Sequence, residues 1–149
     1  MMKKLLLIFL CLPIISLAQQ TYVPDDSFEA YLETNGLGNG IINDDSVNTN
    51  SISYVSSLAF FSNTPNGFNG WIYDLTGIED FTALTSLDCD YSLHPTLTSI
   101  DLSQNTSLVN LDCSDNQLTS LNLNSALQSL DCSNNQITSL DISNNTMLS

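Results

Sequence analysis

Positive charge is almost absent from this 149-residue sequence. Lys3 and Lys4 are its only basic residues, whereas sixteen residues are Asp or Glu, and the formal net charge is −14 at pH 7. A chain with this balance is repelled by nucleic acids and by surfaces of anionic lipid, so we expect neither as a partner. Cations, cationic surfaces and neutral glycans stay open as partners.

Side chains suited to catalysis are also scarce. His94 is the single histidine, and the sequence contains no G-x-S-x-G motif, no phosphate-binding loop, and no Lys or Arg beyond residue 4 to stabilise an anion. A carboxylate pair for glycoside hydrolysis stays open, because acidic residues are plentiful. Aspartates that point outward from a strand serve mainly for solubility, however. We therefore predict that the chain is not an enzyme, has no catalytic residues and needs no cofactor.

The longest apolar run is short and lies at the start of the chain. Lys3 and Lys4 precede the apolar residues 5–12, and Ser16-Leu17-Ala18 supplies small residues at the −3 and −1 positions of a cleavage site. This pattern predicts a signal peptide over residues 1–18. The alternative, a transmembrane anchor, needs about 20 unbroken apolar residues. We expect a secreted or cell-surface protein that does not insert into the membrane after cleavage.

From Leu84 onward the sequence repeats itself. Residues 108–123 read LVNLDCSDNQLTSLNL and residues 127–145 read LQSLDCSNNQITSLDISNN. Units begin at positions 84, 108, 127 and 148, so their lengths are 24, 19 and 21 residues. A period in the low twenties with the pattern L-x-x-L-x-L-x-x-N is the leucine-rich repeat signature. The last unit has barely begun where the chain stops, so we expect the repeat domain, residues 55–149, to be truncated at its C-terminus.

The spacing within a unit predicts its local structure. Leu130 and Cys132 are two positions apart and therefore face the same side of an extended strand, whereas Asp131 faces the other side. Leu140 and Ile142 repeat this arrangement, so each unit is expected to supply two short strands. Units that stack side by side would align these strands in parallel at about 4.8 Å. The predicted fold is mainly β: a leucine-rich repeat solenoid of stacked parallel strands with a short helical N-terminal cap.

Several recurring residues are predicted to hold the repeats together. Three cysteines remain after the signal peptide, and an odd count argues against a closed disulfide framework. Free cysteines behave as small buried hydrophobes, with metal or disulfide binding as the alternative. The recurring asparagines have amides that can satisfy buried backbone groups at turns. The predicted structural positions are Leu87, Cys89, Leu111, Cys113, Asn116, Leu130, Cys132 and Asn135.

The outward positions of the strands are the candidate binding site. This predicted site comprises Asp88, Asn110, Asp112, Ser129 and Asp131. Trp71 is added to it, because a tryptophan and Phe68 on a Gly-containing loop suit contact with a sugar or peptide. The alternative for Trp71 is that it folds back over the core.

The aspartates of these outward positions also raise the question of calcium. Asp101, Asn122 and Asp141 are expected to form a second outward row beside the first. Carboxylates in rows are compatible with Ca²⁺, which takes several oxygen ligands. Unit charges about 4.8 Å apart in water repel by only about 1 kcal/mol, so the rows can persist without an ion. We predict no metal site in them.

Residues 19–54 do not repeat and are predicted to form an N-terminal cap. Asp25 or Asp26 can begin a helix after Pro24, and Asn35-Gly36 can end it. The helix would place apolar residues on one face and cover the edge of the first coil.

The repeat resembles that of the secreted, internalin-like leucine-rich repeat proteins of Gram-negative bacteria. Residues 72–84, IYDLTGIEDFTAL, are similar to the first coils of such proteins, and residues 22–32, YVPDDSFEAYL, are similar to their N-terminal cap. The resemblance implies adhesion or ligand binding. The expected function is an exported binding or adhesion module that recognises an as yet unknown protein or glycan through its strand face. The alternative is a structural spacer region within a larger multidomain protein.

Overall fold

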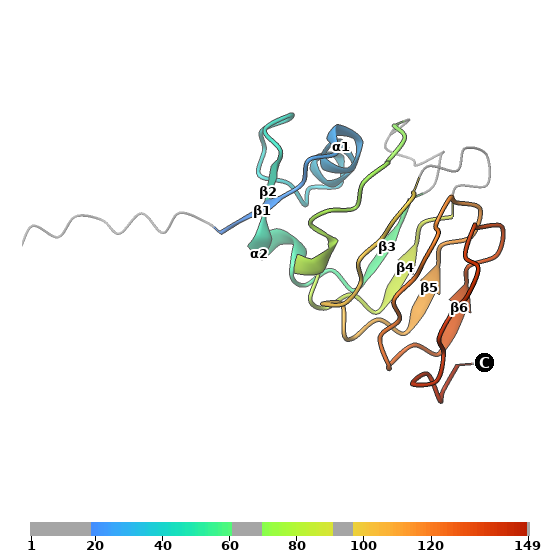
Figure 1. Ribbon diagram of the computed structural model, residues 1–149. Helices are drawn as coiled ribbons and strands as arrows, with labels where there is room; N and C mark the ends of the chain where they lie inside the picture. Colours follow the sequence, from blue (N-terminus) through green and yellow to red (C-terminus); the bar gives the residue numbers. More distant parts are fainter. Residues whose placement is uncertain (1–18, 61–69, 91–96, 149) are drawn as a thin grey trace, which may run out of the picture.

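The computed structural model describes residues 19–60, 70–90 and 97–148 (Figure 1). The predicted signal peptide, Phe68 and His94 therefore lie outside the described residues. Within these ranges the secondary structure is short and mainly β. The elements, in chain order, are β1 (Gln20–Tyr22), α1 (Asp26–Thr34), β2 (Ser46–Asn48), α2 (Thr49–Ile52), β3 (Ser57–Ala59), the 3₁₀ helix η1 (Ile78–Asp80), β4 (Ser86–Asp88), β5 (Asn110–Asp112) and β6 (Ser129–Asp131). No helix among the described residues is long and apolar enough to span a membrane.

One strand from each repeat joins a parallel sheet. Its order is β3-β4-β5-β6, so strands that follow one another along the chain are also neighbours in space (Figure 1). The register aligns Leu87 with Leu111 and Leu111 with Leu130. Since each leucine is the middle residue of a three-residue strand, it points to one face and its two neighbours point to the other. The predicted parallel pairing of successive repeats is confirmed.

The prediction of a second strand in each unit is wrong. Residues 100–102, 121–123 and 140–142 form no strand, although Leu102 and Leu121 still point into the core. Side-chain amides link the coils just after these segments: the Asn124 amide donates to the Asn105 carbonyl (3.1 Å), and the Asn145 amide donates to the Asn124 carbonyl (2.6 Å). A side-chain amide reaches across a wider gap than a backbone N–H does. These segments therefore need not approach to the spacing of about 4.8 Å that a ladder requires.

The repeated leucines and cysteines form one continuous core. Leu87 and Leu111 are buried, as are Cys89 and Cys113, and all three described cysteines are free thiols. Burial decreases toward β6, where Leu130 and Cys132 are only partly buried. Removal of these thiols from water raises the pKa of Cys113 to about 12, with the neighbouring Cys132 as the next cause. The same desolvation holds the pKa of Cys89 well above its ordinary value, so both stay protonated at neutral pH.

Two asparagines join adjacent coils at the turn after the strand. The Asn116 side chain is buried; its Nδ2 donates to the Cys89 carbonyl (2.9 Å), and its Oδ1 accepts from the Leu97 N–H (3.1 Å). One coil later, the half-buried Asn135 donates to the Cys113 carbonyl (2.8 Å) and accepts from the Leu118 N–H (2.9 Å). Each amide thus satisfies backbone groups that would otherwise be buried without partners.

The predicted N-terminal helix is present as α1. Asp25 is its N-cap, and one carboxylate oxygen accepts from the N–H groups of Ser27 (2.9 Å) and Phe28 (2.8 Å). The helix ends at Asn35, and Gly36 follows in the left-handed region with φ of 72°.

Helix α1 packs its apolar face against the start of the sheet. The Phe28 ring lies edge-on to Phe60 at 5.6 Å, and the Tyr31 hydroxyl donates to the carbonyl of Ala59, the last residue of β3 (3.1 Å). The helix therefore lies at the β3 end of the sheet (Figure 1). Strands β1 and β2 pair antiparallel beside it, with Thr21 opposite Val47, and this pairing was not predicted.

Candidate functional site

The outward residues of β4, β5 and β6 form one row of polar side chains across the sheet. The register places Asp88 beside Asp112 and Asp112 beside Asp131, while Asn110 lies beside Ser129. Asn110, Ser129 and Asp131 are exposed, and Asp88 and Asp112 are half-buried. The structure thus brings together five of the six residues of the candidate binding site; we call these five the strand-face row.

Each aspartate of the row is oriented by the residue two positions later. The Ser114 hydroxyl donates to Asp112 (2.7 Å), the Ser133 hydroxyl donates to Asp131 (2.6 Å), and the backbone N–H of each serine donates to the same oxygen. These hydrogen bonds fix the carboxylates without neutralising them. The second oxygen of each carboxylate is therefore held in a defined place from which it can accept a hydrogen bond from a partner.

The carboxylates of the row differ in their tendency to ionise. The Ser133 hydroxyl and N–H hold the pKa of Asp131 below its ordinary value. Burial raises the pKa of Asp88, and the negative charge of neighbouring Asp112 raises it further. The row consequently keeps its charge most firmly at the exposed β6 end.

Trp71 does not belong to the strand-face row. It lies in the irregular segment that leads to η1, outside the sheet, and 37% of its surface is exposed. Its side chain is therefore neither fully folded over the core nor placed on a strand beside the aspartates.

The second outward row lies on segments that form no strand. Asp101, Asn122 and Asp141 are all exposed. Asp101 and Asp141 each accept a hydrogen bond from the backbone N–H of the serine two residues later (2.9 Å), and these bonds lower the pKa of both carboxyls. Among the residues that the structure describes, neither aspartate row gathers three acidic groups within 4.8 Å of one another.

A pocket that the sequence did not indicate lies between the η1 region and the coil that follows β4. Its volume is about 340 Å³, and its lining includes Asp74, Glu79, Ile100 and Asp101. These residues come from two different units, so no pattern within one unit could have revealed the pocket. Its acidic lining matches the charge of the strand-face row.

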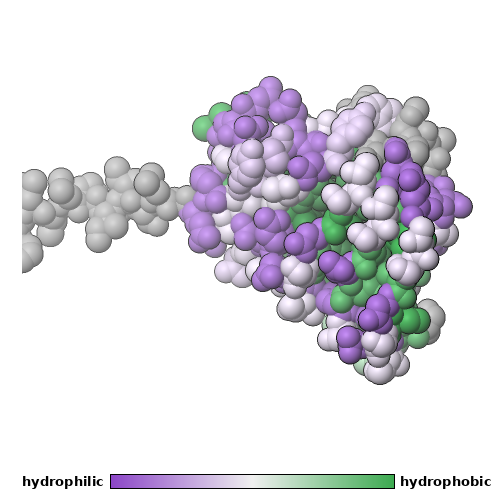
Figure 2. All heavy atoms as spheres, viewed as in Figure 1, coloured by the Kyte–Doolittle hydropathy of each residue, from purple (hydrophilic) through white to green (hydrophobic). Residues whose placement is uncertain are grey.

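The surface is not uniformly polar. Hydrophilic side chains cover the region around α1 and β2 in Figure 2, whereas apolar surface on the same face gathers toward the C-terminal coil. Ile142 and Met147, which belong to that coil, are more than half exposed.

Comparisons with known proteins give similarities to solved structures but no match to a family model. No model of a known protein family matches the chain, and no curated protein matches it either. Among solved structures, the chain is similar to the functional domain of InlJ from Listeria monocytogenes, which is described as including a cysteine ladder. The two share 25% sequence identity with a TM-score of 0.49, and the alignment covers 88% of this chain and 32% of that one. The chain thus spans about a third of the length of the InlJ structure.

Proposed function

We propose that this chain is an exported leucine-rich repeat solenoid that serves as a binding or adhesion module, with no catalytic activity of its own. Its strand-face row would contact a protein or a glycan. The single observation that carries the proposal is the in-register alignment of outward polar residues on β4, β5 and β6. The sheet spaces such groups at about 4.8 Å, a rigid array suited to contacting several groups of one partner at once.

The chemistry of the row favours a particular kind of partner. It offers fixed carboxylate oxygens from Asp112 and Asp131, together with the amide of Asn110 and the hydroxyl of Ser129. A partner must therefore present hydrogen-bond donors or positive charge, as a glycan hydroxyl face or a basic protein surface does. Polyanions would be repelled, since the net charge of the chain is −14.

The ionisation of two outward carboxylates adds support for a binding role rather than catalysis. The pKa of Asp131 is lowered by the hydroxyl and N–H of Ser133, and the pKa of Asp141 is lowered by the N–H and hydroxyl of Ser143. Groups of this kind are poor general acids, which need a raised pKa to hold a proton near neutral pH.

A binding screen with matched variants tests the proposal. The purified protein is applied to an array of neutral glycans and to a panel of purified cell-surface proteins, and its affinity for each positive is measured. The double variant Asp112→Asn/Asp131→Asn should weaken binding at least tenfold. The control Asp101→Asn/Asp141→Asn removes the same charge from carboxylates that also accept a hydrogen bond from a serine N–H, and should change the affinity less than twofold.

Two outcomes would contradict the proposed function. Equal losses in the two double variants would show that net charge, and not the strand-face row, governs binding. The absence of any binding partner across both panels would favour the spacer role instead.

A further inference from the structure

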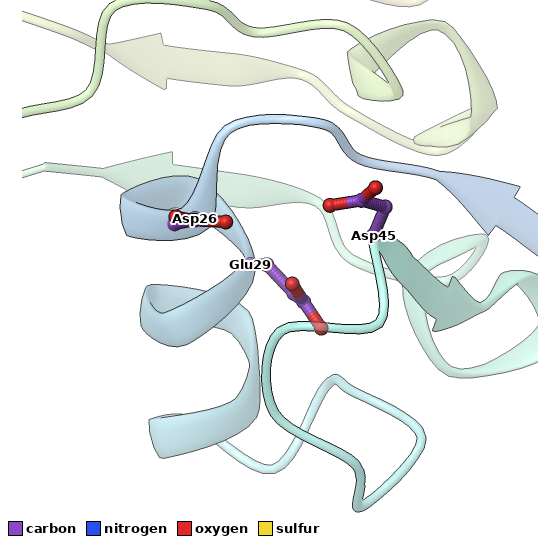
Figure 3. A group of neighbouring side chains, drawn as sticks. All are labelled: Asp26, Glu29 and Asp45. Carbon is purple, nitrogen blue, oxygen red and sulfur yellow. The ribbon is translucent and has the colours of Figure 1, made fainter.

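Three acidic side chains converge in the N-terminal part of the molecule, away from the strand-face row. Asp26 and Glu29 come from the first turn of α1, and Asp45 comes from the loop that precedes β2 (Figure 3). One carboxylate oxygen of each lies within 4.8 Å of those of the other two. Asp26 and Asp45 are exposed, whereas Glu29 lies beneath them.

Glu29 is the unusual member of this cluster. Its side chain is 0% exposed, Oε1 accepts from the Asp44 N–H (3.2 Å), and Oε2 has no hydrogen-bond partner. A buried carboxylate oxygen without a partner is strongly unfavourable unless a proton or a cation neutralises it. Two further carboxylates beside it make the unfavourable term larger.

The described residues include no lysine or arginine that could neutralise Glu29. Lys3 and Lys4 are the only such residues of the sequence and belong to the predicted signal peptide, and the single histidine, His94, lies outside the described residues. Burial raises the pKa of Glu29, and the charge of Asp44 also raises it, whereas the backbone N–H groups of Asp44 and Asp45 lower it. The neutralising group must therefore come from solvent, as a proton or as a metal ion.

Of the two aspartates in the loop before β2, Asp45 is the one available to bind an ion. Asp44 is already engaged by the Asn39 amide (3.1 Å) and by the N–H and hydroxyl of Ser46 (both 3.1 Å). Asp45 has a left-handed backbone conformation with φ of 57°, and its carbonyl accepts from the Val23 N–H (2.9 Å), which ties the loop to the segment between β1 and α1.

We propose that Asp26, Glu29 and Asp45 bind a divalent cation, with Ca²⁺ preferred. All three ligands are oxygens, as Ca²⁺ requires, and they lie within 4.8 Å of one another, close enough for all three to contact one ion at about 2.4 Å. Mg²⁺ demands shorter contacts of about 2.0–2.1 Å and stricter geometry. The ion would give Glu29 Oε2 its partner, with water in the remaining positions, and would fasten α1 to the loop before β2.

Calcium titration of the intact protein tests this site. Isothermal titration with CaCl₂ should show one bound ion, and the thermal midpoint should rise by about 5–10 °C when the ion is present at a hundredfold excess over its Kd. Glu29→Gln removes the buried charge at constant shape and should weaken Ca²⁺ binding at least tenfold. Asp141→Asn, a matched loss of one exposed carboxylate far from the cluster, should alter it less than twofold.

Further measurements keep the proposal open to refutation. Should Glu29→Gln fail to fold, Asp45→Asn is the second variant, since asparagine tolerates a positive φ and Asp45 is exposed. An equal rise in thermal midpoint with MgCl₂ would indicate screening of the net charge and would overturn the proposal. An unchanged Ca²⁺ response in both cluster variants would also overturn the proposal. So would a Glu29→Gln protein that is more stable than the wild type in the presence of Ca²⁺, because it would show that a proton and not a metal ion neutralises Glu29.

Discussion

Asn116 offers the sharpest test of how the coils are held together. Only 4% of its surface is exposed, and its amide contacts the backbone of four other residues: Cys89, Cys113, Ser114 and Leu97. In the variant Asn116→Ala the Cys113 carbonyl keeps a partner, because the Asn135 amide also donates to it (2.8 Å). The Cys89 carbonyl and the Leu97 N–H, which belong to the preceding coil, lose theirs, as does the Ser114 carbonyl within the same turn.

The expected cost is worked out from the two groups of the preceding coil, the Cys89 carbonyl and the Leu97 N–H. A buried backbone group left without a hydrogen bond costs about 1–3 kcal/mol, so Asn116→Ala should destabilise the protein by about 2–5 kcal/mol. This is a large share of the total stability of a domain, which is about 5–15 kcal/mol. The matched variant Asn135→Ala removes the equivalent bonds one coil later, where Asn135 is half-buried and water can replace them. It should cost about 1–2 kcal/mol.

Urea denaturation followed by far-ultraviolet circular dichroism measures both values. The difference between the variants is informative only if the m-value stays that of the wild type, because a changed m-value reports a changed folded or unfolded state. A cost below 1 kcal/mol for Asn116→Ala, or an equal cost for Asn135→Ala, would refute the idea that buried amides carry the stacking of the coils.

Four further predictions concern the thiols, the core and the helix cap. Iodoacetamide at pH 8 should modify the half-buried Cys132 before Cys89 and Cys113, and similar rates at all three positions would contradict the buried assignment. The pKa of Cys89 and Cys113 is raised in the folded state, so the folded protein keeps its full stability below pH 9 and loses stability as the pH rises toward 12. Urea denaturation over this range should show the free energy of unfolding falling by about 1.4 kcal/mol per pH unit for each thiol. Leu111→Ala should cost about 2–5 kcal/mol in the same assay, since the side chain is 3% exposed in the middle of the sheet, and a cost below 1 kcal/mol would show loose packing there. Asp25→Ala should cost about 1–2 kcal/mol, because it removes the N-cap of α1, and circular dichroism should show reduced helix content; an unchanged spectrum and stability would rule out the capping role.

The repeated part of this protein could be anticipated from local pattern. Leu130 and Cys132 are two residues apart and recur in each unit, and a period of two has one structural meaning, a strand with alternate residues facing the core. The helix over residues 26–34 could also be predicted from local pattern. Asp25 and Gly36 are typical residues at the start and end of a helix, and each acts within one turn of it.

The same local pattern failed where neighbouring coils decide the outcome. Leu140 and Ile142 have the spacing of a strand, yet residues 140–142 form none. A strand requires a partner backbone at ladder distance, and amides such as that of Asn145 link the coils at this side instead.

The sequence alone determined that leucines and cysteines would face inward and aspartates outward, since that division follows from the alternation of side chains along any extended chain. Only the tertiary structure decided what happens in the non-repeating N-terminal part. It paired β1 with β2, buried Glu29, and brought Asp45 to within 4.8 Å of two carboxylates on α1. These contacts join residues that lie far apart in the chain and belong to no repeat, so no local sequence pattern predicts them. Only the folded loop brings their charges together.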